Sequence, residues 1–207
     1  MAAVLRSDSG RCGYSGSWMI FPGGAARHTQ RMILLVRPAT TSDAADIAAV
    51  HVDAWRRAYR GLISQGYLDA LSVSDRAHTW AQMIGEPKTD GSAILVAELD
   101  GQCIGFATTG RSRDQDANAH TGELRGLYVH PVHWRSGHGH VLHNEAMNVL
   151  WCADLTAATL WVLTANLRAR QFYEKHGWLP DGAHKRDQRG DQILHETRYT
   201  LGRFPPR

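Results

Sequence analysis

Cysteine is scarce in this chain of 207 residues. It has three cysteines, Cys12, Cys103 and Cys152, which is an odd number, and they form no CxxC pair. This pattern predicts free thiols in a reducing compartment instead of a disulfide scaffold. No apolar run approaches the roughly 20 residues of a membrane helix, and charged residues interrupt the N-terminus too early for a secretory signal. We therefore expect a cytoplasmic protein that does not act in a membrane.

The chain also lacks a large excess of basic over acidic residues. Lys plus Arg number 23 and Asp plus Glu number 20, so the net charge is +3, and the basic residues are scattered. This balance predicts no nucleic-acid partner and is only a weak sign of an anionic ligand. Apolar residues make up 43% and charged residues 21% of the chain, which is ordinary for a globular domain with one core.

The first 31 residues show little pattern. They are rich in Gly, Ser and Arg, include Pro22-Gly23-Gly24, and have neither helical nor strand periodicity. We interpret residues 1–31 as a flexible extension or a mis-assigned start, and a transit peptide is the alternative because arginines there outnumber acidic residues. The patterned domain is expected over residues 32–207.

Short apolar runs alternate with helical patterns from Met32 onward. Asp100-Gly101 predicts a two-residue hairpin turn with positive φ at both positions. The mixture of hairpins and strand–helix–strand connections predicts an α/β fold of the α+β type, with a partly antiparallel and partly parallel sheet of about six to seven strands flanked by helices. The pattern predicts strands at 33–36, 93–99, 103–109, 123–129, 159–163 and twice after 178, clear helices at 43–58, 138–151 and 166–176, and weaker ones at 67–71 and 76–84.

The segment LYVHPVHWRSGHGH, residues 127–140, joins a strand end to a helix start. Gly137 and Gly139 allow the backbone to turn tightly, and free N–H groups in the first turn of a helix bind anions. Two glycines alone are equally typical of an ordinary turn. A P-loop is disfavoured because no Lys-Ser or Lys-Thr follows the glycines. The segment therefore indicates a site for a phosphate or diphosphate.

Two motifs together resemble the GNAT superfamily of N-acetyltransferases. The family signature is Gln or Arg, two residues, Gly, one residue, then Gly or Ala; Gly137 and Gly139 match it, whereas Trp134 occupies the first position and Arg135 is displaced by one. LWVLTANLRARQFYEKHGW, residues 160–178, resembles the second motif. The resemblance spans about residues 35–201 and implies a GNAT-like sheet. It also implies transfer of an acetyl group from acetyl-CoA to a primary amine, in a ternary complex and without a metal.

The resemblance assigns cofactor roles to named residues. The strand end would contact the pantetheine arm of coenzyme A through its backbone, and the turn would bind the diphosphate. Asn166 would cap a helix and reach the cofactor. The cofactor-binding positions are Leu127, Tyr128, Val129, Arg135, Ser136, Gly137, His138, Gly139, His140 and Asn166. Trp55 and Tyr59 lie in the family's acceptor region, where they would bind substrate or, alternatively, pack in a core.

Acetyl transfer needs a deprotonated amine, a donor for the oxyanion and an acid for the leaving thiolate. The family's tyrosine at the position of Tyr173 faces the sulfur as general acid; aromatic packing is the alternative role. Glu123, at the start of the cofactor-binding strand, is the predicted base, and a solvent-facing strand glutamate is the alternative. A backbone N–H near Tyr128 or Val129 would stabilise the oxyanion.

Five histidines crowd residues 130–143, and imidazole is a good zinc ligand. No cysteine or carboxylate accompanies them at ligand spacing, so we predict no metal. The expected partner is an amine-bearing acceptor that the sequence does not identify, and a homodimer is one possible assembly. A non-catalytic acyl-CoA-binding or regulatory module is the alternative function, because Trp134 replaces the first residue of the signature.

Overall fold

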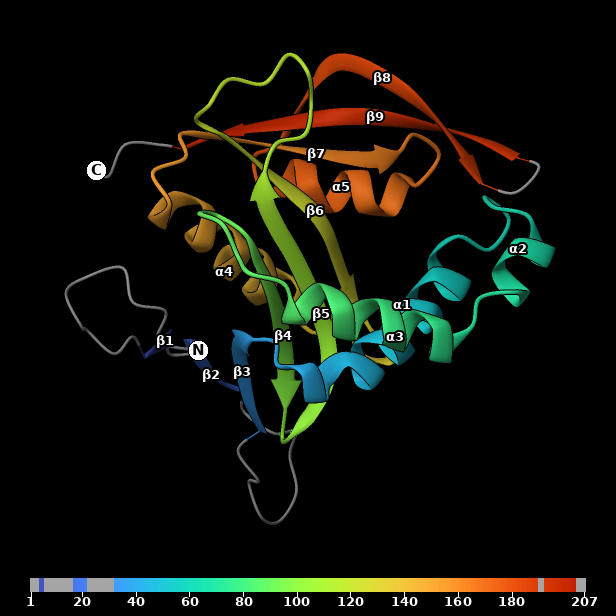
Figure 1. The fold of residues 1–207 in the computed structure, drawn as a ribbon, viewed down its shortest axis with the longest axis vertical. Helices are drawn as coiled ribbons and strands as arrows, with labels where there is room; N and C mark the ends of the chain where they lie inside the picture. Colours follow the sequence, from blue (N-terminus) through green and yellow to red (C-terminus); the bar gives the residue numbers. More distant parts are fainter. Residues whose placement is uncertain (1–3, 6–16, 22–31, 190–191, 204–207) are drawn as a thin grey trace.

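A mixed sheet runs through the part of the chain that the computed structural model describes, residues 4–5, 17–21, 32–189 and 192–203 (Figure 1). The strand order is β1-β2-β3-β4-β5-β6-β7-β9-β8. Strands β6 and β7 are parallel, and the other neighbouring pairs are antiparallel. The strands are β1 (Val4–Leu5), β2 (Ser17–Phe21), β3 (Met32–Pro38), β4 (Ala93–Leu99), β5 (Gln102–Arg111), β6 (Thr121–Val129), β7 (Ala157–Leu163), β8 (Leu179–Arg189) and β9 (Gln192–Gly202).

Helices flank this sheet, and the predicted fold class is confirmed by the seven strands β3–β9. None of the helices within the described ranges is long and apolar enough to span a membrane. The short strands β1 and β2 extend the sheet beyond β3 and were not predicted; the interpretation of residues 1–31 otherwise lies outside the described residues. The helices are η1 (Thr41–Asp43), α1 (Ala44–Ala58), α2 (Gln65–Asp69), α3 (Val73–Gly85), η2 (Pro131–His133), α4 (His138–Cys152) and α5 (Leu167–Lys175).

Alternation along β4 gives the sheet two buried faces. Leu95 and Ala97 belong to a core that also contains Leu142 and Leu150 of α4. Ile94, which directly precedes Leu95, belongs to a second core with residues of α1 and α3. Because successive strand side chains point to opposite faces, one strand packs against helices on both sides. Figure 1 accordingly shows α1 and α3 together on one side of β4–β6 and α4 on the other.

Local turn signals are confirmed where the sequence predicted them. Asp100 and Gly101 have φ of 48° and 83° in the turn between β4 and β5. Gly177 has φ of 83° just after α5. The Asn166 side chain accepts a hydrogen bond from the N–H of Ala169 at 3.2 Å and so caps the start of α5.

Strands β6 and β7 pair over a short distance and then separate. Thr121 to Glu123 of β6 lie opposite Ala157 to Thr159 of β7, and no later residues of the two strands pair. Arg125 forms a bulge in β6, since Leu124 and Gly126 face the consecutive residues Thr109 and Thr108 of β5; such bulges bend a strand and increase its twist. Figure 1 shows β7, β8 and β9 crossing the direction of β4–β6. The second half of β6 therefore has an open edge.

Close packing at this junction can be tested at Gly122. A Cβ atom at Gly122 would lie 2.9 Å from Cδ2 of Leu150 and 3.0 Å from Cδ1 of Leu155. Gly122→Ala should therefore lower the free energy of unfolding by about 1–3 kcal/mol, measured by urea denaturation. Gly66→Ala is the control, because nothing lies within 4 Å of its new Cβ. An unchanged stability in Gly122→Ala would contradict the packing of β6 on α4.

Candidate functional site

The open edge of β6 presents backbone groups that no neighbouring strand uses. His130, just after β6, donates its N–H to the carbonyl of Ile104 in β5 at 2.8 Å. Because backbone groups alternate in direction along an antiparallel strand, those of Tyr128 also face β5, whereas those of Leu127 and Val129 face the open side. Of the three predicted contacts to pantetheine, the register thus leaves Leu127 and Val129 available through the backbone. Tyr128 contributes its side chain instead.

Trp134 closes the end of this edge. Its Nε1 donates to the carbonyl oxygen of Val129 at 2.7 Å. The Cζ atom of Arg168, in the first turn of α5, lies 3.3 Å from the centroid of the Trp134 ring, which is a cation–π contact. The residue that departs from the family signature therefore holds the turn against β6 and α5. Sequence reasoning missed Arg168, although it lies two residues after the predicted cap Asn166.

The glycine turn collects backbone donors at the start of α4. Arg135 and Gly137 have φ of 65° and 83°, and Gly137 is the N-cap of the helix. The N–H groups of Ser136, Gly137 and Gly139 form no hydrogen bond with the described residues. His140 donates its N–H to the carbonyl of Gly137 at 3.0 Å. Free amides at the positive end of a helix dipole make a site for an anion such as a diphosphate.

Three cationic side chains lie near this turn. Burial lowers the pKa of Arg168; Tyr59 raises it, and the charges of Arg135 and Arg57 lower it. In the described part of the chain Arg168 has no carboxylate partner. Like charges repel unless a counter-ion lies between them. An anionic ligand at the turn would relieve that repulsion.

His140 and the predicted turn residue His138 point elsewhere than into the turn. The Nδ1 atom of His140 lies 2.7 Å from Nε2 of His176, and its Nε2 lies 3.2 Å from Nδ2 of Asn144, so its ring links α4 to α5. His138 is buried, and its ring centroid lies 5.7 Å from that of His133. Within the described ranges no group of three His, Cys, Asp or Glu side chains could hold a metal ion.

Three tyrosines from different elements meet beside the open edge. Burial raises the pKa of Tyr173 in α5 well above its usual value, and Tyr128 raises it further. Burial also raises the pKa of Tyr59, with added contributions from Tyr128 and Tyr173. These mutual effects require the hydroxyls to lie near one another. The structure thus brings together the predicted acid and a predicted substrate-binding residue, and the Tyr173 hydroxyl keeps its proton at neutral pH.

Trp55, the other predicted substrate-binding residue, forms a wall beside these tyrosines. Its ring centroid lies 5.0 Å from that of Tyr59 and 5.5 Å from that of His51. The Nε1 atom of Trp55 is buried and has no hydrogen bond of good geometry in the part of the chain described. It lies near the hydroxyl of Tyr128 and lowers the pKa of that tyrosine, although burial raises this pKa by more. The wall therefore places a buried indole N–H beside the Tyr128 hydroxyl.

Glu123 lies at the junction of β6 and β7 and is only 4% exposed, so the alternative of a solvent-facing strand glutamate is wrong. Arg113, in the loop after β5, donates from Nε and Nη2 to its two carboxylate oxygens at 2.9 and 2.7 Å. Arg125 of the bulge lies 3.7 Å from Oε2. Both oxygens are thus held by an arginine that sequence reasoning did not select.

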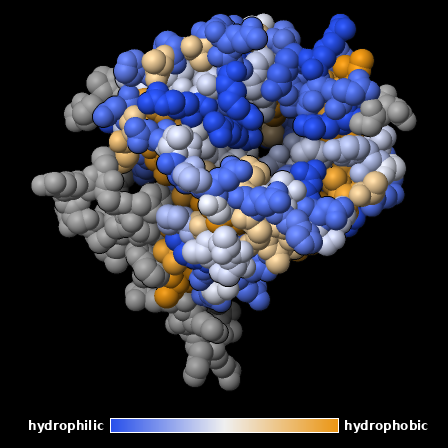
Figure 2. Space-filling model, in the orientation of Figure 1, coloured by the Kyte–Doolittle hydropathy of each residue, from blue (hydrophilic) through white to orange (hydrophobic). Residues whose placement is uncertain are grey.

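The surface is hollowed on the face that carries α1 and α5. Figure 2 shows a hollow on this face of the molecule, bordered by strongly hydrophilic residues. The open edge of β6 leads from the glycine turn toward Tyr173, and Trp55 and Tyr59 approach Tyr128 from α1. An elongated anionic ligand and a second molecule could therefore reach the tyrosines from different sides.

Comparison with known proteins agrees with this geometry. The family described as Acetyltransferase (GNAT) family matches residues 51–178. A probable N-acetyltransferase of Mycobacterium tuberculosis is 30% identical, over 71% of this chain and 80% of its own length. A PaiA N-acetyltransferase of Thermoplasma acidophilum, solved with coenzyme A, superposes with a TM-score of 0.60 at 21% identity and covers 80% of this chain and 99% of its own. A putative acetyltransferase of Salmonella typhimurium, solved with acetyl-CoA, gives 0.58 at 20% identity, with 82% and 93% covered. The family match covers more than half of the sequence, and this chain belongs to the GNAT family of acetyltransferases.

Proposed function

We propose that this protein transfers the acetyl group of acetyl-CoA directly to a primary amine in a ternary complex. The observation that carries the proposal is the open edge of β6, which runs from a turn of free amides to the hydroxyl of Tyr173. Two solved proteins of the same fold hold coenzyme A or acetyl-CoA, which supports this choice of acyl donor. The acceptor is a small molecule or a protein amine.

Coenzyme A fits the groups available along this edge. The amides of Ser136, Gly137 and Gly139 would bind the diphosphate, and Arg135 and Arg168 would neutralise its charge. The pantetheine amides would pair with the open backbone of Leu127 and with the N–H of Val129, whose carbonyl already accepts from Trp134, much as an added strand pairs with a sheet edge. That alignment directs the thioester toward Tyr173.

The reaction then needs three contributions from the protein. The amine nitrogen forms a bond to the thioester carbon, and a free backbone N–H of the open β6 edge stabilises the oxyanion that develops on the carbonyl oxygen. The carbon–sulfur bond breaks, and the sulfur takes the proton of the Tyr173 hydroxyl. Glu123 accepts the proton that the nitrogen loses, through a water molecule, because Arg113 holds both of its oxygens.

The general test is release of free thiol from acetyl-CoA in the presence of a panel of primary amines. We expect at least one amine to accelerate release and to appear as an N-acetyl product by mass spectrometry. If coenzyme A binds but no amine accelerates release, the protein is instead the non-catalytic acyl-CoA-binding module considered above.

The diphosphate turn is tested by Gly137→Ala. Positive φ at Gly137 makes a Cβ atom strained by about 1–2 kcal/mol, and relief of that strain would move the free amides. We expect the Kd for coenzyme A, measured by calorimetry, to rise at least about tenfold. Gly182→Ala is the control, because its φ is 88° in strand β8 and nothing lies within 4 Å of its new Cβ. An equal effect of both variants on Kd would contradict a role for the turn.

The acid is tested by Tyr173→Phe. Loss of the proton donor should lower kcat by about 10²–10⁴-fold and leave the KM for acetyl-CoA nearly unchanged. Tyr199→Phe is the matched control. The buried hydroxyl of Tyr199, in β9, donates to Oε1 of Glu174 in α5 at 2.7 Å. If kcat of Tyr173→Phe equals that of the wild type across the pH range, Tyr173 is not the general acid.

The base is tested by comparing Glu123→Gln with Arg113→Gln. If Glu123 accepts the proton, its replacement lowers kcat about 10²-fold or more, whereas Arg113→Gln frees the carboxylate and retains or raises kcat. If Glu123 only anchors the loop, both variants lower the free energy of unfolding and neither changes kcat. Stopped-flow thiol release and urea denaturation separate the two outcomes.

A further inference from the structure

An unpaired guanidinium lies on the acceptor side of the recess. Arg76 of α3 is half-buried, and its Cζ lies 5.4 Å from the centroid of the Trp55 ring. Among the described residues its side chain has neither a carboxylate within 4 Å nor a hydrogen-bond acceptor. Arg56 of α1 differs, because it donates to the carbonyls of Leu68, Asp69 and Leu71. Arg76 therefore contacts α1 through the Trp55 ring and, in the described part of the chain, not through a side-chain hydrogen bond.

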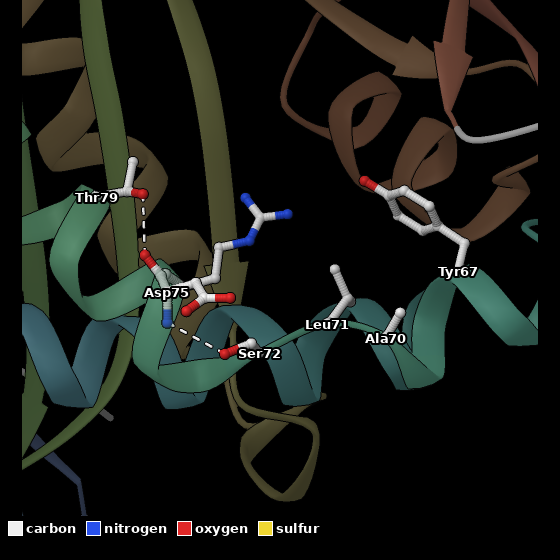
Figure 3. Close-up of a pocket in the computed structure, with 7 residues that line it drawn as sticks. Tyr67, Ala70, Leu71, Ser72, Asp75 and Thr79 are labelled. Atoms are coloured by element: carbon white, nitrogen blue, oxygen red, sulfur yellow. Dashed lines mark hydrogen bonds between the residues drawn. The ribbon is translucent and has the colours of Figure 1, made fainter.

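Arg76 lines a pocket of about 320 Å³ between α2 and α3. Figure 3 shows Tyr67 and Leu71 on one side of this pocket and Asp75 and Thr79 on the other. Asp75 is exposed, and it forms no ion pair with Arg76 in the described part of the chain. Solvent screens an exposed carboxylate more strongly than a half-buried cation. The pocket thus places a half-buried guanidinium beside Tyr67 and Leu71.

Trp55 connects this pocket to the three tyrosines. Its ring centroid lies 6.4 Å from that of Tyr67, which lines the pocket, and 5.0 Å from that of Tyr59. The charge of Arg76 also reaches Tyr128, whose pKa it lowers against the larger effect of burial. A small molecule held by Arg76 could therefore extend past the indole to the reacting centre.

The unsatisfied polar groups around this wall are donors. The Nδ1 atom of His51 accepts a hydrogen bond from Nε1 of Trp80 at 3.3 Å, so the hydrogen of the neutral ring lies on Nε2. That Nε2 and Nε1 of Trp55 are buried without a partner in the described residues. Because these two atoms are buried, the half-buried guanidinium of Arg76 is the donor of this wall that we consider for a ligand. A carboxylate supplies acceptors and the opposite charge.

We propose that Arg76 determines specificity by binding a carboxylate of the acceptor, so that the favoured substrates carry an amine and a carboxylate on one molecule. Because the indole of Trp55 lies between Arg76 and the tyrosines, the two groups should be several bonds apart. The inference rests on the proposed function, and it identifies the acceptor class as small ω-amino acids.

The experiment uses the full chain and a series from glycine to 6-aminohexanoate, each compared with its primary amide. We expect the wild type to prefer the longer carboxylates over their amides by about tenfold or more in kcat/KM, the range of a hydrogen bond to a charged group. Arg76→Gln should raise the KM for these carboxylates by about the same factor. The KM for the amides and the KM for acetyl-CoA should each change less than about twofold.

Two variants control for charge and for folding. Arg186→Gln removes an exposed arginine of β8 that has no ion pair in the described residues, and it should leave the preference intact. Arg76→Lys keeps the charge and loses the planar fork, so it should restore part of the preference. If Arg76→Gln shows no cooperative transition in thermal unfolding and is therefore not folded, Arg76→Lys provides the comparison.

The outcomes separate this inference from the function on which it rests. Equal use of carboxylates and amides by the wild type overturns the inference and leaves the acetyltransferase intact. Absence of transfer to every amine counts against the proposed function; binding of N-acetyl-6-aminohexanoate to the protein loaded with coenzyme A, measured by calorimetry, then decides the inference. Binding that weakens about tenfold in Arg76→Gln supports it, and binding that is equal in the two proteins or absent in both overturns it.

Discussion

The separation of β6 from β7 is the constraint on which the rest of the site depends. The two strands pair only as far as Glu123 and Thr159, and the bulge at Arg125 turns β6 away. A parallel strand in the interior of a sheet normally uses both rows of its backbone groups. Here one row stays open over the second half of β6, and the helix that follows β6 begins at the glycine turn. Strand pairing that ends early thus leaves a hydrogen-bonding edge, and the glycine turn lies at the end of that edge.

Unpaired donors and cations mark the two approaches to this edge. Arg168 lies over Trp134 at the glycine turn, and Arg76 lies over Trp55 on the acceptor side. Stacking on an aromatic ring stabilises a guanidinium and leaves its N–H groups free for a ligand. The ion pairs elsewhere, such as that of Arg37 with Asp43 at 2.8 Å, serve the fold. These two stacked arginines are therefore the ones that we propose as ligand-binding groups.

The sequence predicted features whose causes are local. Asp100-Gly101, Gly177 and the Asn166 cap each depend on residues within a few positions, and the structure has them as expected. The glycine turn was likewise visible, because positive φ at Gly137 is a property of one residue. The strand alternation that buries both faces of β4 follows from apolar residues in the sequence.

Features that depend on distant residues were not predicted. The partner of His140 is His176, 36 residues further along the chain, so its ring was assigned to the phosphate. Arg113 and Arg168 were not selected from the sequence, because their partners Glu123 and Trp134 are brought to them only by the fold. Strand β2 has no periodicity in the sequence and is defined by its backbone pairing with β3. The roles of Tyr173 and Glu123 came from resemblance to a family and remain predictions.

The most direct measurement of the central claim is a crystal structure of the protein with acetyl-CoA. Our account predicts the diphosphate on the amides of residues 136–139, the pantetheine along the open edge of β6 at Leu127 and Val129, and the sulfur beside the hydroxyl of Tyr173. A diphosphate bound elsewhere, or an acetyl group remote from Tyr173, would contradict it.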